Sequence, residues 1–286
     1  MLYTSTRGKT DMVCSAHAIV QGLADDGGLF MPQNFTPLTM TEICAIREQS
    51  YTERAVTILS HFLTDFTDEE LRECVESAYT KEKFGEFPVP LHPITDKLAV
   101  LELWHGPTSA FKDMALQLLP LLMTKSLKKT GERQKVVILV ATSGDTGKAA
   151  LAGFADVPDT EIIVFYPDGG VSPIQRKQMV TQAGANVHVV AVQGNFDDAQ
   201  SSVKAILSNP ELNALVADNG YTFSSANSIN WGRLVPQIVY YFSAYADAVK
   251  SGKVAVSAPV NFVVPTGNFG DILAGFFAKM MGLPVK

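Results

Sequence analysis

The sequence contains few cysteines and no long hydrophobic run. Its three cysteines, Cys14, Cys44 and Cys74, are an odd number, and none of them belongs to a CxxC pair. This usage argues against a disulfide framework or a zinc cage and favours a reducing compartment, so we expect a cytoplasmic protein. No apolar stretch reaches the roughly 18–20 residues of a transmembrane helix, and the N-terminus lacks the apolar segment of a secretory signal. We therefore expect no membrane partner.

The sequence also lacks a large excess of positive or negative charge. The 286 residues carry 23 Lys and Arg against 29 Asp and Glu, a formal net charge of −6. A broad basic surface for nucleic acid is therefore not expected. The five histidines are scattered without metal-ligand spacing, so no metal site is predicted. With 47% hydrophobic residues, the chain can bury a large core, in one large domain or two moderate ones.

The first 95 residues differ in pattern from the rest and are predicted to be helical. Thr39–Glu42 and Thr67–Glu70 are Thr-x-x-Glu capping boxes, and apolar residues recur at helical spacing between and after them. This pattern predicts three short helices over residues 40–80. The segment Gly85–Pro93 contains three prolines and cannot be regular helix, so we place a domain boundary there, at about residue 95.

Beyond residue 96, short apolar runs alternate with helical segments. Runs that are apolar throughout suit strands covered on both faces, and their alternation with helices predicts a parallel, doubly wound α/β sheet. A long amphipathic helix is predicted over residues 229–249, with Pro236 as a kink or in its first turn. In such sheets, ligands bind at the carboxyl ends of the strands. The predicted strands are Leu98–Leu103, Val136–Val140, Ile162–Tyr166, Val187–Val192 and Phe262–Val264.

Two of the loops at predicted strand ends suit an anion. Ala141–Lys148 (ATSGDTGK) is not a P-loop, because only two residues separate its glycines. It is either a hydroxyl-rich helix N-terminus that binds an anion or an ordinary tight turn. Pro265–Asp271 (PTGNFGD) has two glycines around a helix start, which lets backbone amides approach a phosphate, but it is not a dinucleotide fingerprint.

A third loop, His105–Asp113 (HGPTSAFKD), carries a candidate reactive amine. Lys112 stands among small and apolar residues, where desolvation lowers a lysine's pKa and permits Schiff-base chemistry. Most lysines are solvated surface charges, so position alone does not decide the role of Lys112.

Taken together, five segments resemble the threonine synthases, in the pyridoxal-phosphate (PLP) family that also contains the tryptophan synthase β chain and threonine dehydratase. The resemblance covers essentially the whole chain. PLP relatives outside the threonine synthases often have Asn where Asp145 stands, which favours threonine synthase over the dehydratases. The segments are QGLADDGGLFMP (Gln21–Pro32), HGPTSAFKD (His105–Asp113), ATSGDTGKAA (Ala141–Ala150), SSANSINWGR (Ser224–Arg233) and PTGNFGD (Pro265–Asp271).

This resemblance implies a tryptophan synthase β-like α/β fold of doubly wound parallel sheets with a helical N-terminal domain over residues 1–95. Residues 96–286 then form the PLP-binding region, in which about 130–230 is the smaller, mobile lobe and the remainder belongs to the larger lobe. Chains of the family run further, and their hydrogen-bond partner for the pyridine nitrogen lies in that later part. We therefore expect a C-terminally incomplete chain that binds PLP weakly and turns substrate over poorly by itself.

The resemblance also implies roles for individual residues, with pyridoxal 5'-phosphate as the cofactor. Lys112 is the catalytic, Schiff-base lysine. Arg233 is expected to bind the substrate phosphate, because its planar guanidinium can donate two parallel hydrogen bonds to that group. The alternative is that Arg233 is a solvated helix residue. The cofactor contacts are Lys112, Asp145, Gly267, Asn268, Phe269, Gly270 and Asp271. The substrate contacts are Thr142, Ser143, Thr146, Lys148, Asn227, Ser228, Asn230 and Arg233.

The expected activity is that of a carbon–oxygen lyase in threonine biosynthesis. It converts O-phospho-L-homoserine and water into L-threonine and phosphate by β,γ-replacement, with Lys112 as the proton shuttle. Another PLP-dependent lyase, such as a threonine or serine dehydratase, is the alternative enzyme. A non-catalytic anion-binding protein derived from this fold is the alternative from another class. The expected partner is a small-molecule substrate, and the expected assembly is a monomer or homodimer.

Overall fold

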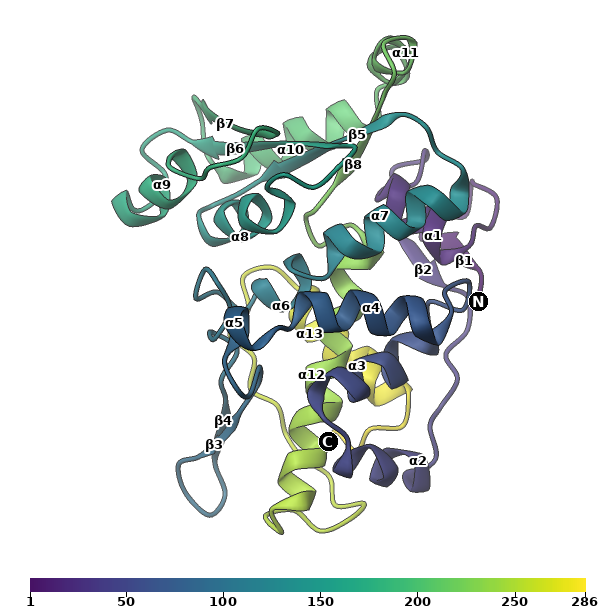
Figure 1. Ribbon diagram of the computed structural model, residues 1–286, viewed down its shortest axis with the longest axis vertical. Helices are drawn as coiled ribbons and strands as arrows, with labels where there is room; N and C mark the ends of the chain where they lie inside the picture. Colours follow the sequence, from purple (N-terminus) through teal and green to yellow (C-terminus); the bar gives the residue numbers. More distant parts are fainter.

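A four-stranded parallel sheet lies at one end of the molecule, next to a body made mostly of helices (Figure 1). The computed structural model describes all residues from 1 to 286. The strand order is β7-β6-β5-β8, and α8 and α10 pack against the sheet from opposite faces (Figure 1). The doubly wound α/β prediction is thereby confirmed for this sheet. Its elements are β5 (Lys135–Ala141), α8 (Asp145–Phe154), β6 (Thr160–Pro167), α9 (Pro173–Val180), β7 (Val187–Val192), α10 (Phe196–Leu207), α11 (Pro210–Asp218) and β8 (Tyr221–Ser225).

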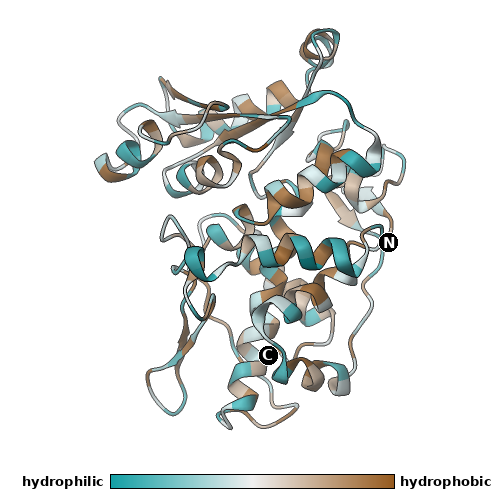
Figure 2. Ribbon diagram, viewed as in Figure 1, coloured by the Kyte–Doolittle hydropathy of each residue, from teal (hydrophilic) through white to brown (hydrophobic).

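The central strand β5 is buried on both faces, as its apolar sequence predicts. Residues 136–141 are all buried. Ile138 and Val140 join the main core of the protein, whereas Val137 and Leu139 pack with Ala199 of α10 in a smaller cluster. This alternation follows from the period of two in a strand. Figure 2 shows the strands of this sheet largely in the colour of hydrophobic residues.

Two predicted strands lie outside this sheet. The run Leu98–Leu103 contributes only β4 (Ala99–Leu101), which pairs antiparallel with β3 (Leu91–Pro93) in an exposed hairpin. Phe262–Val264 forms no strand in this structure, and nearby Val260 makes only an isolated bridge to Val285. Both predictions were therefore wrong about the sheet, because a short apolar run does not specify its hydrogen-bonding partner.

The body combines the N-terminal helices with two helices from the end of the chain. Both predicted capping boxes are present, and Ser50 with Glu53 forms a further one. Pro236 lies inside α12 rather than in its first turn. No helix is long and apolar enough to cross a bilayer. The elements are β1 (Tyr3–Ser5), α1 (Ser15–Gln21), β2 (Phe30–Pro32), α2 (Met40–Ala45), the 3-10 turn η1 (Ile46–Glu48), α3 (Tyr51–Ser60), α4 (Asp68–Ala78), α5 (Lys81–Phe84), α6 (Asp113–Leu116), α7 (Leu119–Thr130), α12 (Trp231–Lys250) and α13 (Gly270–Met280).

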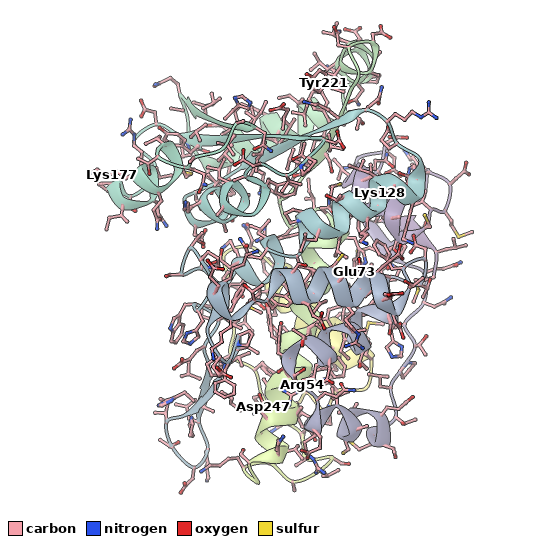
Figure 3. The ribbon with its side chains drawn as sticks, in the orientation of Figure 1. Arg54, Glu73, Lys128, Lys177, Tyr221 and Asp247 are labelled. Atoms are coloured by element: carbon pink, nitrogen blue, oxygen red, sulfur yellow. The ribbon has the colours of Figure 1, made fainter.

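One hydrophobic core of 59 buried residues contains side chains from both the first and the last part of the chain. The ring of Tyr3 in β1 lies 5.3 Å from that of Trp231 in α12. Buried Arg54 of α3 donates to the Ser243 hydroxyl at 2.8 Å and pairs with Asp247 of α12 at 2.8 Å (Figure 3). The predicted domain division near residue 95 thus crosses a shared core, and it stays a prediction.

Candidate active site

A cleft of about 530 Å³ lies between the sheet lobe and the helical body. This is within the range of roughly 300–1,000 Å³ that small-molecule sites occupy. Its walls combine the loop that follows the β3–β4 hairpin with the start of α8, the inner side of α9 and the loop before α13. The lining residues are Leu101, Leu103, Trp104, Thr108, Ser109, Ala110, Phe111, Asp145, Lys148, Gln175, Gln178, Pro265 and Asp271.

Lys112 stands directly beside two residues of this cleft. Its Nζ donates to Asp145 Oδ2 at 2.6 Å and lies 4.2 Å from the centroid of the Phe111 ring. The Lys112 side chain is only 13% exposed. Burial lowers the pKa of the Lys112 ammonium, and the Asp145 carboxylate opposes that shift. The solvated-lysine alternative is therefore wrong, and the amine is kept partly desolvated.

A tight turn built on Asp113 fixes the position of Lys112. The Asp113 carboxylate accepts hydrogen bonds from the Thr108 backbone N–H at 2.8 Å and the Thr108 hydroxyl at 2.7 Å. A Cβ on Gly106 would lie 2.5 Å from the Asp113 Cβ, so the turn closes only with glycine there. Burial raises the pKa of Asp113, and the Thr108 hydrogen bonds oppose this. Sequence analysis assigned Asp113 no role of its own.

The turn between β5 and α8 is shaped by the buried Thr142. Its hydroxyl accepts from the backbone N–H of Gly144 at 2.9 Å and from that of Gly147 at 2.8 Å. Gly144 has φ of +147°, and a Cβ there would collide with the Gln175 side chain. Gln175 thus covers the N-terminus of α8. Thr142 holds the turn through these bonds, and its contact with the substrate stays a prediction; Ser143 is exposed at the tip of the turn.

Two predicted substrate residues also bind the backbone. The Asn227 side chain bonds both the N–H and the carbonyl of Ala141, at 3.1 and 2.9 Å. Fully buried Asn230 caps α12 and donates to the carbonyls of Ile19 and Ser225, both at 2.9 Å. These amides join the end of β8 to β5 and to α1, so their polar atoms serve the fold. Their contact with the substrate stays a prediction.

Two basic residues of the substrate prediction lie close to the cleft. Arg233 is 2% exposed, donates to the Ala226 carbonyl at 2.8 Å and has a buried Nε without a partner. The solvated-residue alternative for Arg233 is therefore wrong. Burial lowers its pKa to about 10, so Arg233 stays charged at neutral pH. Lys148 lines the cleft with its Nζ on the Gln182 side chain, and burial lowers the pKa of Lys148 while Asp113 opposes this.

The glycine-rich loop before α13 is open to solvent in its first part. Gly267, Asn268 and Phe269 are exposed, and a Cβ on Gly267 would meet no atom within 4 Å. Gly270 is buried, and a Cβ there would lie 2.8 Å from the Ser228 hydroxyl, so the structure brings these two predicted residues together. The Asp271 carboxylate accepts hydrogen bonds from two tyrosines of α12.

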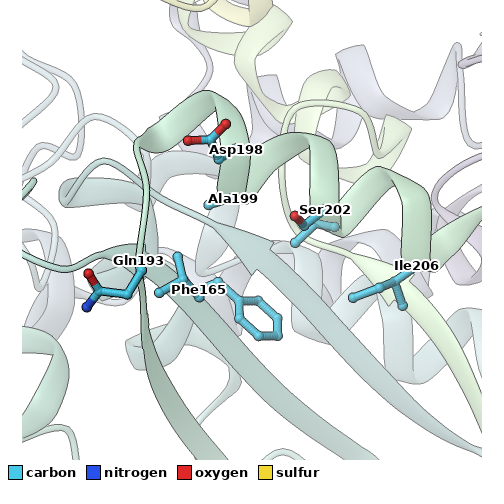
Figure 4. A pocket seen from close by; sticks show the side chains of 8 residues that line it. Phe165, Gln193, Asp198, Ala199, Ser202 and Ile206 are labelled. Atoms are coloured by element: carbon cyan, nitrogen blue, oxygen red, sulfur yellow. The ribbon is translucent and has the colours of Figure 1, made fainter.

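A second, smaller cavity of about 140 Å³ lies between α10 and the sheet (Figure 4). Phe165 of β6 lies below Ala199, Ser202 and Ile206 of α10 (Figure 4). The one acidic residue that lines this cavity, Asp198, accepts a hydrogen bond from the Asn195 backbone N–H in a capping box. The N-terminus of α8, with Asp145, lies on the opposite face of the sheet. This cavity is therefore separate from the cleft beside Lys112. No group of three His, Cys, Asp or Glu in the structure could hold a metal ion.

Sequence reasoning missed the two glutamines on the inner side of α9. Gln175 and Gln178 line the cleft, but glutamine at a helix surface is ordinary and carries no local signal. Trp104 was missed in the same way: it is 50% exposed and stacks on His105, whose Nε2 lies 2.8 Å from Glu102. The signal for these residues lies only in the fold, which brings α9 opposite the loop that contains Trp104.

Two family models match consecutive parts of this chain. Residues 2–79 match the family description "Threonine synthase N terminus", and residues 85–284 match "Pyridoxal-phosphate dependent enzyme". Threonine synthase of Schizosaccharomyces pombe is 42% identical over 99% of this chain, and that of Pseudomonas aeruginosa is 42% identical over 100%. These matches cover 55% and 58% of the two relatives, so the chain spans little more than half of their length.

Solved structures show the same relationship. The crystal structure of PLP-bound threonine synthase from Brucella melitensis matches with a TM-score of 0.85 and 42% identity. It covers 100% of this chain, and this chain covers 59% of it. The fold predicted from the sequence motifs is confirmed by this match.

Proposed function

Since this chain belongs to the family of pyridoxal-phosphate dependent enzymes, we propose that it carries the cofactor-binding and catalytic residues of a threonine synthase acting on O-phospho-L-homoserine. The observation that carries the proposal is the Lys112 amine, partly desolvated and hydrogen-bonded to Asp145 beside the cleft. The identity to threonine synthases across the whole chain supports this substrate over those of the dehydratases.

The residues present fit pyridoxal 5'-phosphate. Lys112 offers an amine with a lowered pKa to the cofactor aldehyde. Open space at the Cβ position of Gly267 leaves the amides of Gly267–Phe269 accessible to the phosphate, at the N-terminus of the eleven-residue α13. When bound, the cofactor supplies an electron sink that lowers the cost of removing a proton from the substrate carbon.

Lys112 is the group that moves protons in this proposal. Its burial and the nearby positive charge of Arg233 both favour the neutral amine, which accepts a proton at Nζ. The Asp145 carboxylate favours the protonated form and holds Nζ in one direction. Because these influences oppose each other on one amine, Lys112 can accept a proton at Nζ and return it.

The substrate is held from both sides of the cleft. Exposed Ser143 and buried Thr146, at the N-terminus of α8, face the substrate carboxylate, where the helix dipole favours an anion. Lys148, Ser228 and the charged Arg233 supply the positive and polar groups for the substrate phosphate. The lobe of residues 130–230 closes over the bound substrate and removes water from these groups. The monomer or homodimer state and the cytoplasmic location stay predictions.

Chemical trapping tests the proposal directly. The protein is incubated with pyridoxal 5'-phosphate, reduced with borohydride and digested, and the pyridoxyl group is expected on the Lys112 peptide. Lys112→Arg is expected to lose that label while it keeps its thermal melting temperature. Phosphate release from O-phospho-L-homoserine, compared with ammonia release from threonine, then separates synthase from dehydratase. A label on Lys125 or Lys148 instead would contradict the assignment.

A further inference from the structure

Two adjacent tyrosines of α12 hold the first turn of α13 through one carboxylate. The Tyr240 hydroxyl donates to Asp271 Oδ1 at 2.5 Å. The Tyr241 hydroxyl lies 2.8 Å from the same oxygen and 2.9 Å from the Asp271 backbone carbonyl. Both tyrosines are at most 2% exposed, so water does not compete for these hydrogen bonds. Asp271 directly follows Gly270, the last glycine of the loop proposed to bind the cofactor phosphate.

Close packing one turn later fixes the same part of α13 independently. A Cβ on Gly275 would lie 2.9 Å from the ring of Tyr241, so the ring is seated where only glycine leaves room. Gly270 in turn packs against Ser228. The start of α13 is therefore held by side chains of α12 on one side and by the loop before α12 on the other.

The Asp271 carboxylate also presents an electrostatic problem. A negative charge in the residue after the glycine loop repels a bound phosphate, and this repulsion is larger away from bulk water. Two hydroxyl donors on one carboxylate oxygen draw its charge towards α12. Burial raises the pKa of both phenols, so Tyr240 and Tyr241 remain protonated donors at neutral pH. They are thereby suited to counter the charge of Asp271.

The two tyrosines stand on the same helix as the buried Arg233. Between them in sequence, Gln237 donates from Nε2 to the Arg233 backbone carbonyl at 3.0 Å. A shift of α12 would therefore move Arg233 and the two hydroxyls that hold Asp271 together.

We propose that Tyr240 and Tyr241 are positioning residues for the cofactor phosphate. They hold Asp271 against α12, and thereby keep the amides of the Gly267–Gly270 loop in place and the carboxylate away from the phosphate. This inference rests on the proposed function, because it takes that loop as the phosphate site.

The test compares a ligand that has the phosphate with one that lacks it. Dissociation constants for pyridoxal 5'-phosphate and for pyridoxal are measured by equilibrium dialysis on the full chain. Tyr240→Phe/Tyr241→Phe is expected to weaken pyridoxal 5'-phosphate binding about tenfold and pyridoxal binding by less than about twofold. Tyr245→Phe is the matched control, because this tyrosine is buried in the same helix and its hydroxyl is not bonded to α13; both constants are expected to stay unchanged.

Hydrogen exchange of residues 266–271 without ligand gives a second readout, and faster exchange is expected in the double variant. Should that variant fail to fold, each single Tyr→Phe variant is measured instead, with a loss of about threefold expected for the phosphate ligand. Equal weakening of both ligands, or unchanged pyridoxal 5'-phosphate affinity, overturns the inference and leaves the proposed function standing. A wild-type chain that takes up no cofactor on Lys112 overturns both.

Discussion

Lys112 shows how its sequence neighbours place an amine in a partly desolvated position. Phe111 lies under its ammonium group, and Asp113 is the buried anchor around which the preceding turn closes. The motif identified Lys112, but its desolvation is a property of the folded turn. A lysine in an extended peptide of the same sequence is solvated and has an ordinary pKa.

The lowered pKa of Lys112 predicts a measurable pH dependence. An amine-directed acylating reagent should label Lys112 of the folded protein with a midpoint at lower pH than Lys112 of the urea-unfolded protein. Asp145→Asn should move the midpoint lower still, because the variant removes the carboxylate that stabilises the ammonium form. Quantitative mass spectrometry of the labelled peptides gives both midpoints. Equal midpoints in the folded and the unfolded protein would count against the desolvated amine.

Gly267→Val is expected to weaken binding of pyridoxal 5'-phosphate far more than it weakens folding. No atom lies within 4 Å of the new Cβ, so the free energy of unfolding should change by less than about 0.5 kcal/mol. The branched side chain nevertheless covers the amides offered to the phosphate. Urea unfolding and equilibrium dialysis measure the two effects, with Gly267→Ala as an intermediate step. A folded Val variant with wild-type affinity would remove this loop from the site.

The polar residues of the matched segments show the limit of sequence reasoning at this scale. Thr142, Asn227 and Asn230 stand inside motifs, yet each satisfies backbone groups of its own chain. Motif membership fixes position along the chain but not whether a side chain faces a ligand or the backbone. Asp271 is a similar case, since its carboxylate accepts hydrogen bonds from two tyrosines that no sequence pattern singled out.

At the scale of helices and strands, prediction succeeded for three apolar runs of the parallel sheet. β5 and β6 were predictable because they are apolar runs between helices. β7 was predicted with its observed bounds, although none of its residues is buried. β8 escaped notice because it contains Thr222, Ser224 and Ser225, hydroxyl residues that suggest a loop. The run at 262–264 had the right composition but finds no neighbouring strand in this structure.

The contact between α8 and α6 depends on one glycine. A Cβ on Gly153 would collide with the backbone carbonyl oxygen of Leu116, which cannot rotate away as a side chain can. Gly153→Ala is expected to separate the two helices and to lower the free energy of unfolding by about 1–3 kcal/mol. Urea denaturation measures this, and Gly267→Ala, which meets open space, is the control. A Gly153→Ala protein as stable as the control would show that the helices are not tightly packed.

For the molecule as a whole, the N-terminal helices and α12 depend on each other. The single side chain of Arg54 joins α3 to both Ser243 and Asp247 of α12. It also donates to the Ile46 carbonyl at 3.0 Å. A fragment of residues 96–286 should therefore fail to fold, because the face of α12 that packs on α3 would be exposed to water. Circular dichroism during a thermal melt tests this. A cooperative melt of the fragment would show that the division near residue 95 separates independent domains.

The bond from Asn230 to the Ile19 carbonyl spans 211 residues of sequence, and this separation matters while the protein is being made. Ribosomes add about 5–20 residues per second, so α1 emerges on the order of ten to forty seconds before the segment that caps it. During that interval the nascent chain displays Tyr3 and the other apolar residues that later enclose Trp231. Until α12 is made and completes the core, these apolar residues are open to chaperones and to aggregation.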